Sequence, residues 1–109
     1  MVIGCQELVD DLSRLGVSAG GLMMVHSSLR SLGLVEGGAQ MVVDALLECL
    51  GPRGTLVVPT FTFAAPNQSG FVFDSAQTPS EMGAISEAAG RRAGAQRSIH
   101  VFHSIAAVG

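Results

Sequence analysis

Short apolar runs alternate with helix-like segments along this 109-residue chain, and the alternation limits the folds that it can adopt. The runs at 22–26 and 55–59 have the length of strands, and a third run begins near His103. We expect the first to be buried on both faces, as in a sheet between two layers of helices. The order predicts an α/β fold, a three-layer α/β/α sandwich with a mostly parallel or mixed sheet.

Two segments carry the apolar spacing of helices. Residues 4–16 place Leu8, Leu12 and Leu15 on one face. Residues 39–50 are apolar except for one narrow polar stripe, so we expect this helix to be buried on most sides.

A third helix is predicted over residues 78–92. The run Thr78-Pro79-Ser80-Glu81 matches a capping box, in which Thr78 caps the helix and Glu81 closes the box. The preceding residues, 60–77, form a long loop with several phenylalanines, which either line a cleft or fill the core.

The charge content excludes several classes of protein. Only 14% of the residues are charged, the net charge is −3, and all six cationic side chains are arginine. The chain therefore has no basic field for nucleic acid. It also lacks the run of about 18 apolar residues that a membrane span needs. So few charges predict that one face is covered, either by a second copy or by the missing remainder of a longer polypeptide.

The N-terminus and the cysteines indicate the compartment. The first residues lack the basic region of a signal peptide and turn acidic at once, so we expect the reducing cytoplasm. Cys5 and Cys49 belong to no metal-binding pattern, and we expect two buried free thiols.

Polar motifs lie next to two of the predicted strands. The run His26-Ser27-Ser28-Leu29-Arg30-Ser31 opens a Ser- and Gly-rich loop at 27–38 directly after a strand, where α/β sheets bind ligands. Its donors could hold an anionic group such as a pyrophosphate, or they could satisfy the loop's own backbone. Nucleotide-binding glycine motifs and the nucleophile elbow are absent from the sequence.

A second polar group precedes the third strand and contains Arg97, Ser98, His100 and His103. A histidine here could act as a general base or bind a polar ligand, or it could bond to the loop backbone. The two histidines have no acidic or cysteine partner nearby, so no metal site is predicted.

Taken in order, the motifs resemble the N-terminal part of the aminoglycoside N3-acetyltransferases. The resemblance is carried by VHSSLRSLG at 25–33, GGA at 37–39, DALL at 44–47, GTLVVPTFT at 54–62, FD at 73–74, TPSEMGAISE at 78–87 and RSIHVFHS at 97–104. The set covers essentially the whole chain but somewhat under half of the family's domain. The resemblance therefore implies that residues 1–109 are a single partial domain.

The resemblance also implies an activity and a site. The family acetylates the 3-amino group of a deoxystreptamine aminoglycoside with acetyl-CoA as co-substrate and no metal, which confers antibiotic resistance. It implies CoA-binding roles for the first polar motif and weaker ones for the second, with the histidines as support. The CoA-binding candidates are Ser27, Ser28, Leu29, Arg30, Ser31, Arg97 and Ser98, and the supporting ones are His26, His100 and His103. The catalytic base is expected beyond Gly109.

Two other functions stay open at this point. The chain could be a truncated, non-catalytic CoA-binding module, because the expected base is absent. It could also belong to an acetyl-CoA-dependent N-acetyltransferase that acts on a different amine, because most of the acceptor site is missing.

Overall fold

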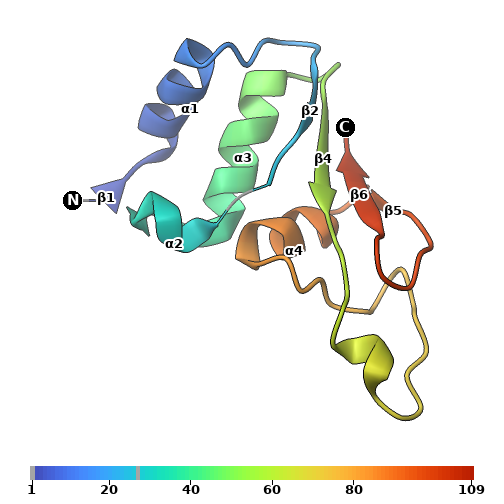
Figure 1. The fold of residues 1–109 in the computed structure, drawn as a ribbon. Coiled ribbons are helices and arrows are strands. Elements are labelled where there is room, and N and C mark those ends of the chain that lie inside the picture. Colours follow the sequence, from blue (N-terminus) through green and yellow to red (C-terminus); the bar gives the residue numbers. More distant parts are fainter. Residues whose placement is uncertain (1, 27) are drawn as a thin grey trace.

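The computed structural model describes residues 2–26 and 28–109, and its strands and helices alternate as the sequence predicts (Figure 1). In chain order the elements are β1 (Val2–Ile3), α1 (Cys5–Arg14), β2 (Leu22–Met24), α2 (Leu29–Leu32), β3 (Leu34–Val35), α3 (Gly38–Leu50), β4 (Thr55–Pro59), a short 3-10 helix (Ala65–Asn67), α4 (Ala84–Gly90), β5 (Gln96–Arg97) and β6 (Ile105–Val108).

The main sheet is mixed, which confirms the predicted α/β class. Its strand order is β2-β4-β6-β5, and β1 and β3 form a separate parallel pair. Strands β2 and β4 are parallel, and β6 runs antiparallel to both β4 and β5. Leu56 of β4 pairs with Met23 on one side and Val108 on the other, so these three side chains point to the same face.

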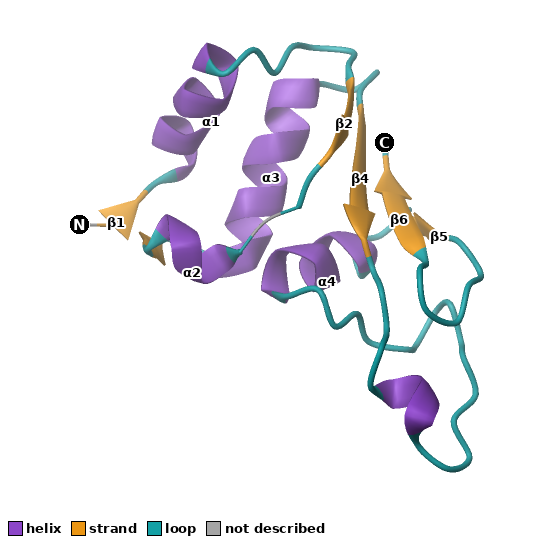
Figure 2. Cartoon of the chain, viewed as in Figure 1, coloured by secondary structure: helices purple, strands orange, loops and turns teal. Residues whose placement is uncertain are grey.

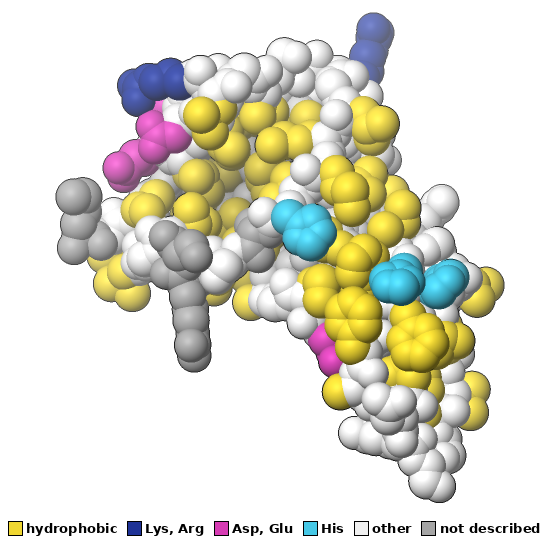
Figure 3. Space-filling view, in the orientation of Figure 1, with side chains coloured by type: hydrophobic (Ala, Val, Ile, Leu, Met, Phe, Trp, Pro, Cys, Tyr) yellow, Lys and Arg dark blue, Asp and Glu magenta, His cyan; other side chains and the backbone are white. Residues whose placement is uncertain are grey.

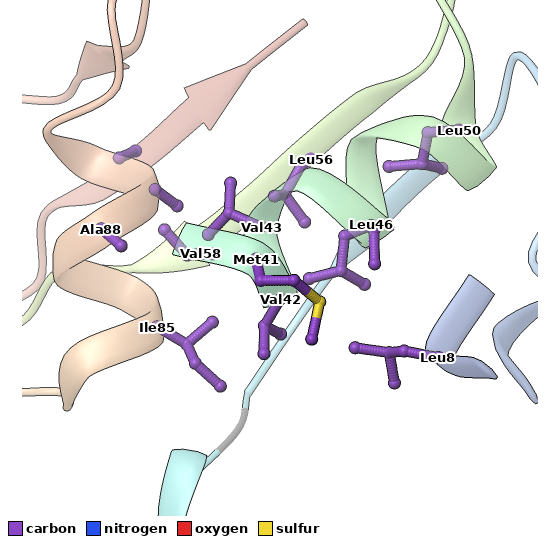
Figure 4. Close-up of a cluster of buried hydrophobic side chains, with 13 residues drawn as sticks. Leu8, Met41, Val42, Val43, Leu46, Leu50, Leu56, Val58, Ile85 and Ala88 are labelled. Atoms are coloured by element: carbon purple, nitrogen blue, oxygen red, sulfur yellow. The ribbon is translucent and has the colours of Figure 1, made fainter. Parts of the chain in front are cut away.

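The core lies between this face of the sheet and the helices (Figure 2). Helix α3 is buried on most sides, as expected, and packs against α1, α4 and β4. Well-buried apolar side chains of the core include Val43, Leu46, Leu50, Leu56, Val58 and Ile85 (Figure 4). Each fully buried aliphatic side chain of this size contributes about 1.5–3 kcal/mol. Small residues on α4, Ala88 and Ala89, let that helix approach the sheet closely.

The opposite face of the sheet is open, so the expectation that the first strand is buried on both faces was wrong. Leu22 is 77% exposed and Met24 53% exposed, while Met23 between them points into the core. On β6, Ile105 is 40% exposed on the same open side. The reason is the placement of the helices: α3 and α4, which pack against the sheet, lie on its other face.

Helix α4 begins at Ala84, so the capping box predicted at Thr78–Glu81 was wrong. The residue before the helix is Gly83, with a φ of 101° that suits glycine. Thr78 instead accepts a hydrogen bond from the Asp74 N–H at 2.8 Å. Glu87 reaches back to accept one from the Ser80 N–H at 3.1 Å. These contacts keep residues 78–81 in the loop.

The N-terminal half departs from expectation in smaller ways. Leu15 lies just past the end of α1 and is 82% exposed, so it is not part of the packed face. The loop predicted at 27–38 contains α2 and β3. Cys5 and Cys49 are free, as expected, but only half-buried. Partial burial, followed by the nearby carboxylates of Glu48 and Asp44, raises the pKa of the Cys5 thiol.

Helix length also bears on the membrane question. Among residues 2–26 and 28–109, no helix has both the length and the apolar character required to cross a membrane.

Candidate functional site

The polar motifs of the sequence meet at one edge of the main sheet. His26 follows β2 and Phe61 follows β4, while His103 precedes β6, which runs the other way. All three therefore lie at the edge where the parallel strands end. In α/β folds this edge is where ligands bind.

Five ring side chains form a cluster at this edge, which we call the His–Phe cluster: His26, Phe61, Phe63, His100 and His103. His103 lies between the two phenylalanines, with ring centroids 5.2 Å from Phe61 and 5.8 Å from Phe63. His26 meets Phe61 at 6.4 Å, and His100 meets His103 at 5.4 Å. Most of these contacts are edge-to-face, the arrangement that aromatic rings prefer.

The cluster is a surface feature rather than part of the core. All three histidines are exposed and Phe63 is 46% exposed, so the phenylalanines of the cluster do not fill the core. Figure 3 shows the three histidines on one face of the molecule with hydrophobic side chains around them.

His100 fixes the turn that carries His103. Its Nδ1 accepts hydrogen bonds from the backbone N–H groups of Phe102 at 3.1 Å and His103 at 2.9 Å. In the neutral ring the proton must then lie on Nε2, which is left to donate outward. His100 therefore fixes the backbone position of its neighbour His103.

Arg97 binds three segments together behind the cluster. Its Nε donates to the Ser104 hydroxyl at 3.0 Å, and one terminal nitrogen donates to the Thr60 carbonyl at 2.9 Å. The other terminal nitrogen donates to the Thr78 carbonyl, and the guanidinium lies over the Phe73 ring at 5.0 Å. Burial lowers the pKa of Arg97, partly offset by the charge of Glu87. Through these three bonds Arg97 holds the loops together.

Ser98 also makes contacts within the fold. Its hydroxyl accepts a hydrogen bond from the Ile105 N–H at 2.9 Å, and its own N–H donates to the Ile105 carbonyl at 2.8 Å. These bonds extend the pairing of β5 with β6. Both weaker CoA-binding candidates, Arg97 and Ser98, are thus engaged in structural bonds.

The stronger candidates lie beside the cluster. Ser27 falls outside the described residues. Ser28 is exposed and directly precedes α2, whose residues include Arg30 and Ser31. Leu29 is partly buried and packs against the core, which anchors the start of α2. His26, in contact with Phe61, connects this segment to the cluster.

Glu81 is the site residue whose role the sequence analysis missed. Its carboxylate accepts hydrogen bonds from the backbone N–H groups of Phe63, Ala64 and Ala65, at 2.9 to 3.2 Å. These bonds, led by that from Ala64, lower the pKa of Glu81. The spacing of TPSE fits a capping box, so the sequence alone gives no signal for this role of Glu81.

Two other kinds of feature could hold a ligand, a group of metal-ligating side chains or a groove in the surface. Within the described part of the chain, no three His, Cys, Asp or Glu side chains gather as a metal ion would require. A groove of about 560 Å³ lies at the other end of the sheet, where Gly54 and Val108 line it. It is remote from the cluster, because Gly54 precedes β4 and Phe61 follows it.

Comparison with known sequences gives a consistent set of relatives. Residues 24–109 match the family model described as aminoglycoside 3-N-acetyltransferase. Aminoglycoside N(3)-acetyltransferase IV of a Salmonella species is 38% identical over 103 residues, which cover 93% of this chain and 38% of that protein.

Solved structures of similar proteins have the same fold over this region. The structure of the aminoglycoside acetyltransferase AAC(3)-Xa has a TM-score of 0.89 at 33% identity, covering 99% of this chain and 44% of that one. A mutant of AAC(3)-IVa in complex with apramycin gives 0.86 at 37% identity, covering 98% and 43%. The chain therefore spans less than half the length of the relatives that it matches.

Proposed function

This chain belongs to the aminoglycoside 3-N-acetyltransferase family, and from that membership we propose that it forms the N-terminal part of an enzyme that acetylates an aminoglycoside. The acetyl group comes from acetyl-CoA and goes to the 3-amino group of a deoxystreptamine ring. Residues 1–109 are then a single partial domain of the three-layer α/β/α sandwich.

One observation carries the proposal beyond family membership. His26, with which the candidate CoA-binding run begins, contacts Phe61 of the His–Phe cluster at the edge of the sheet where β2 and β4 end. The run fits the CoA pyrophosphate, because serine hydroxyls and the Arg30 guanidinium are suited to phosphate oxygens. The cluster then forms a wall of the space in which the acetyl group meets its acceptor.

The reaction requires more than the described residues supply. The acceptor amine must lose a proton as its nitrogen attacks the thioester carbonyl, after which the carbon–sulfur bond breaks and CoA leaves as a thiolate that takes up a proton. We assign no catalytic base to this chain. His26, His100 and His103 are given supporting roles, and the base with its acidic partner is placed in the part of the domain beyond Gly109.

The direct test measures acetyl-CoA binding and turnover separately. We expect acetyl-CoA to raise the melting temperature of the 109-residue chain, since a ligand that binds only the folded state stabilises it. Arg30→Ala should weaken this shift, whereas Arg53→Ala, at an exposed turn, should leave it unchanged. A chain that folds but shows no shift at millimolar acetyl-CoA would contradict the proposal.

The same experiment discriminates the second candidate function, a CoA-binding module without catalysis. That candidate is kept because none of the described residues is assigned the role of catalytic base. Stabilisation by CoA without thiol release in the presence of gentamicin would support it. Thiol release with simple amines but not with gentamicin would indicate a different acceptor.

Resistance and compartment follow from the proposed activity. Acetyl-CoA is a cytoplasmic metabolite, so we place the enzyme in the cytoplasm. Expression of the complete enzyme should raise the concentration of gentamicin needed to inhibit a susceptible bacterium. An unchanged inhibitory concentration, with the enzyme present and folded, would argue against a role in resistance.

A further inference from the structure

We propose that Glu81 is a positioning residue, whose carboxylate holds Phe63 against His103 and thereby shapes the aromatic wall of the ligand site. Only the identity of the ligand rests on the proposed function. The positioning role is inferred from the contacts of Glu81 itself.

Both carboxylate oxygens of Glu81 are engaged by one short stretch of backbone. Oε2 accepts from the Phe63 N–H at 2.9 Å and the Ala65 N–H at 3.2 Å, and Oε1 accepts from the Ala64 N–H at 3.0 Å. Consecutive N–H groups that converge in this way form a concave site for an anion. Here the anion is the carboxylate of Glu81, which lies 16 to 18 residues further along the chain.

The backbone of Glu81 strengthens the same connection. Its N–H donates to the Phe61 carbonyl at 2.9 Å. Residue 81 therefore holds the chain at Phe61 through its main chain and at 63–65 through its side chain. Both attachments lie beyond the end of β4, on the stretch of chain that carries Phe63 outward.

None of the ion pairs between described side chains involves this carboxylate. The ion pairs found there join Arg14 to Asp11, Arg91 to Glu87 and Arg92 to Asp44. The backbone bonds of Glu81 are charge-assisted, which makes them stronger than bonds between neutral groups. The lowered pKa of Glu81 agrees with an ionised carboxylate that these N–H groups stabilise.

Packing alone does not hold Phe63 in place. The residue is 46% exposed, and its described ring contacts are with Phe61 at 6.0 Å and His103 at 5.8 Å. Beyond Phe63 the chain forms a short 3-10 helix, Ala65–Asn67, with no buried residue. The chain is anchored just before Phe63, where the buried Thr62 donates its N–H to the Phe102 carbonyl at 2.9 Å. Beyond Thr62 the Glu81 carboxylate binds the N–H groups of residues 63–65, and without it we expect Phe63 to move away from His103.

The test compares Glu81→Ala and Glu81→Gln with Glu48→Ala, which removes an exposed carboxylate from α3. Two readouts report on position: the nuclear Overhauser contacts between the Phe63 and His103 rings, and the amide proton shifts of residues 63–65. In Glu81→Ala we expect the ring contacts to be lost and the three amide protons to move upfield. Glu81→Gln keeps a carbonyl acceptor and should retain part of both signals, and Glu48→Ala should match the wild type.

A third readout, the affinity for acetyl-CoA, tests whether the position of Phe63 affects ligand binding. We expect acetyl-CoA to bind Glu81→Ala about tenfold more weakly, whereas Glu48→Ala should bind it as the wild type does. If Glu81→Ala fails to fold, Glu81→Gln provides the same comparison. Ring contacts and amide shifts that persist in a folded Glu81 variant would overturn the proposal. A wild type that binds no acetyl-CoA but shows the ring contacts would refute the proposed function and leave the positioning role standing.

Discussion

The hydroxyls of Thr60 and Ser104 lie 2.8 Å apart in the buried interior, where the chain leaves β4 and enters β6. The Ser104 hydroxyl also donates to the Thr60 carbonyl at 2.9 Å and accepts from Arg97 Nε at 3.0 Å. The Ser104 hydroxyl is thus the hydrogen-bond partner of the Thr60 hydroxyl, the Thr60 carbonyl and the Arg97 guanidinium. This network sits directly behind Phe61 and His103.

Ser104→Ala should destabilise the fold by about 1–3 kcal/mol, because it leaves the Thr60 hydroxyl and Arg97 Nε without their partner. Urea unfolding measures this loss. Ser13→Ala on the exposed side of α1 is the control and should change stability by no more than about 0.5 kcal/mol. Equal effects in the two variants would contradict the proposed importance of the network.

Arg97→Lys should lower stability by about 2 kcal/mol despite keeping the charge, since hydrogen bonds to charged groups are worth about 1.5–3 kcal/mol. A lysine cannot donate to Ser104, Thr60 and Thr78 from one planar group. Arg14→Lys provides the same substitution at a site 77% exposed, and it should have little effect. Unfolding curves that shift equally for both variants would show that the planar geometry of Arg97 is unimportant.

Gly54→Ala should destabilise the chain by about 3 kcal/mol or more, because the added Cβ overlaps with α3. It would meet the Leu50 carbonyl oxygen and lie 2.5 Å from Leu50 Cβ. The control is Gly90→Ala, whose Cβ would lie 3.5 Å from Thr60 Cγ2, an ordinary contact. Thermal unfolding should show a large loss for the first variant and little change for the second.

The pKa shift of Glu81 predicts a pH dependence. Its folded pKa lies below the unfolded value, so its stabilising effect is fully present above the unfolded pKa. The effect is then lost as the pH falls through the folded pKa. The melting temperature of Glu81→Gln should therefore be lower than that of the wild type at neutral pH, and the two should converge in acid. A constant difference down to the folded pKa would contradict the assignment.

The parts of the fold with strong local patterns could be predicted from the sequence. Helix α3 and strand β4 begin and end close to the expected residues, because their apolar runs are bounded by glycine and proline. The start of α4 could not be predicted in this way. TPSE satisfies the local rule for a capping box, yet the Glu81 carboxylate is used by residues 63–65, which are distant in sequence.

The candidate site, too, could be predicted only in part. Its motifs could be recognised individually, and their position after strands indicated the sheet edge. The sequence did not indicate that these motifs contact one another in the folded chain. Phe61 reaches His103 because β6 runs antiparallel to β4 with Pro59 opposite Ile105, and this register depends on pairing across the sheet. The exposure of one face of β2 could not be predicted either, because a continuous apolar run is compatible with a strand that is covered on one face or on both.

The place of β4 between β2 and β6 has a consequence for synthesis on the ribosome. One neighbour of this central strand is made before it and the other only after α4 and β5 have emerged. Until then the nascent chain carries an apolar strand whose free edge has unpaired N–H and C=O groups, the kind of edge that pairs with other chains. We therefore expect aggregation of the newly made protein to be greatest while the chain between β4 and β6 is being synthesised.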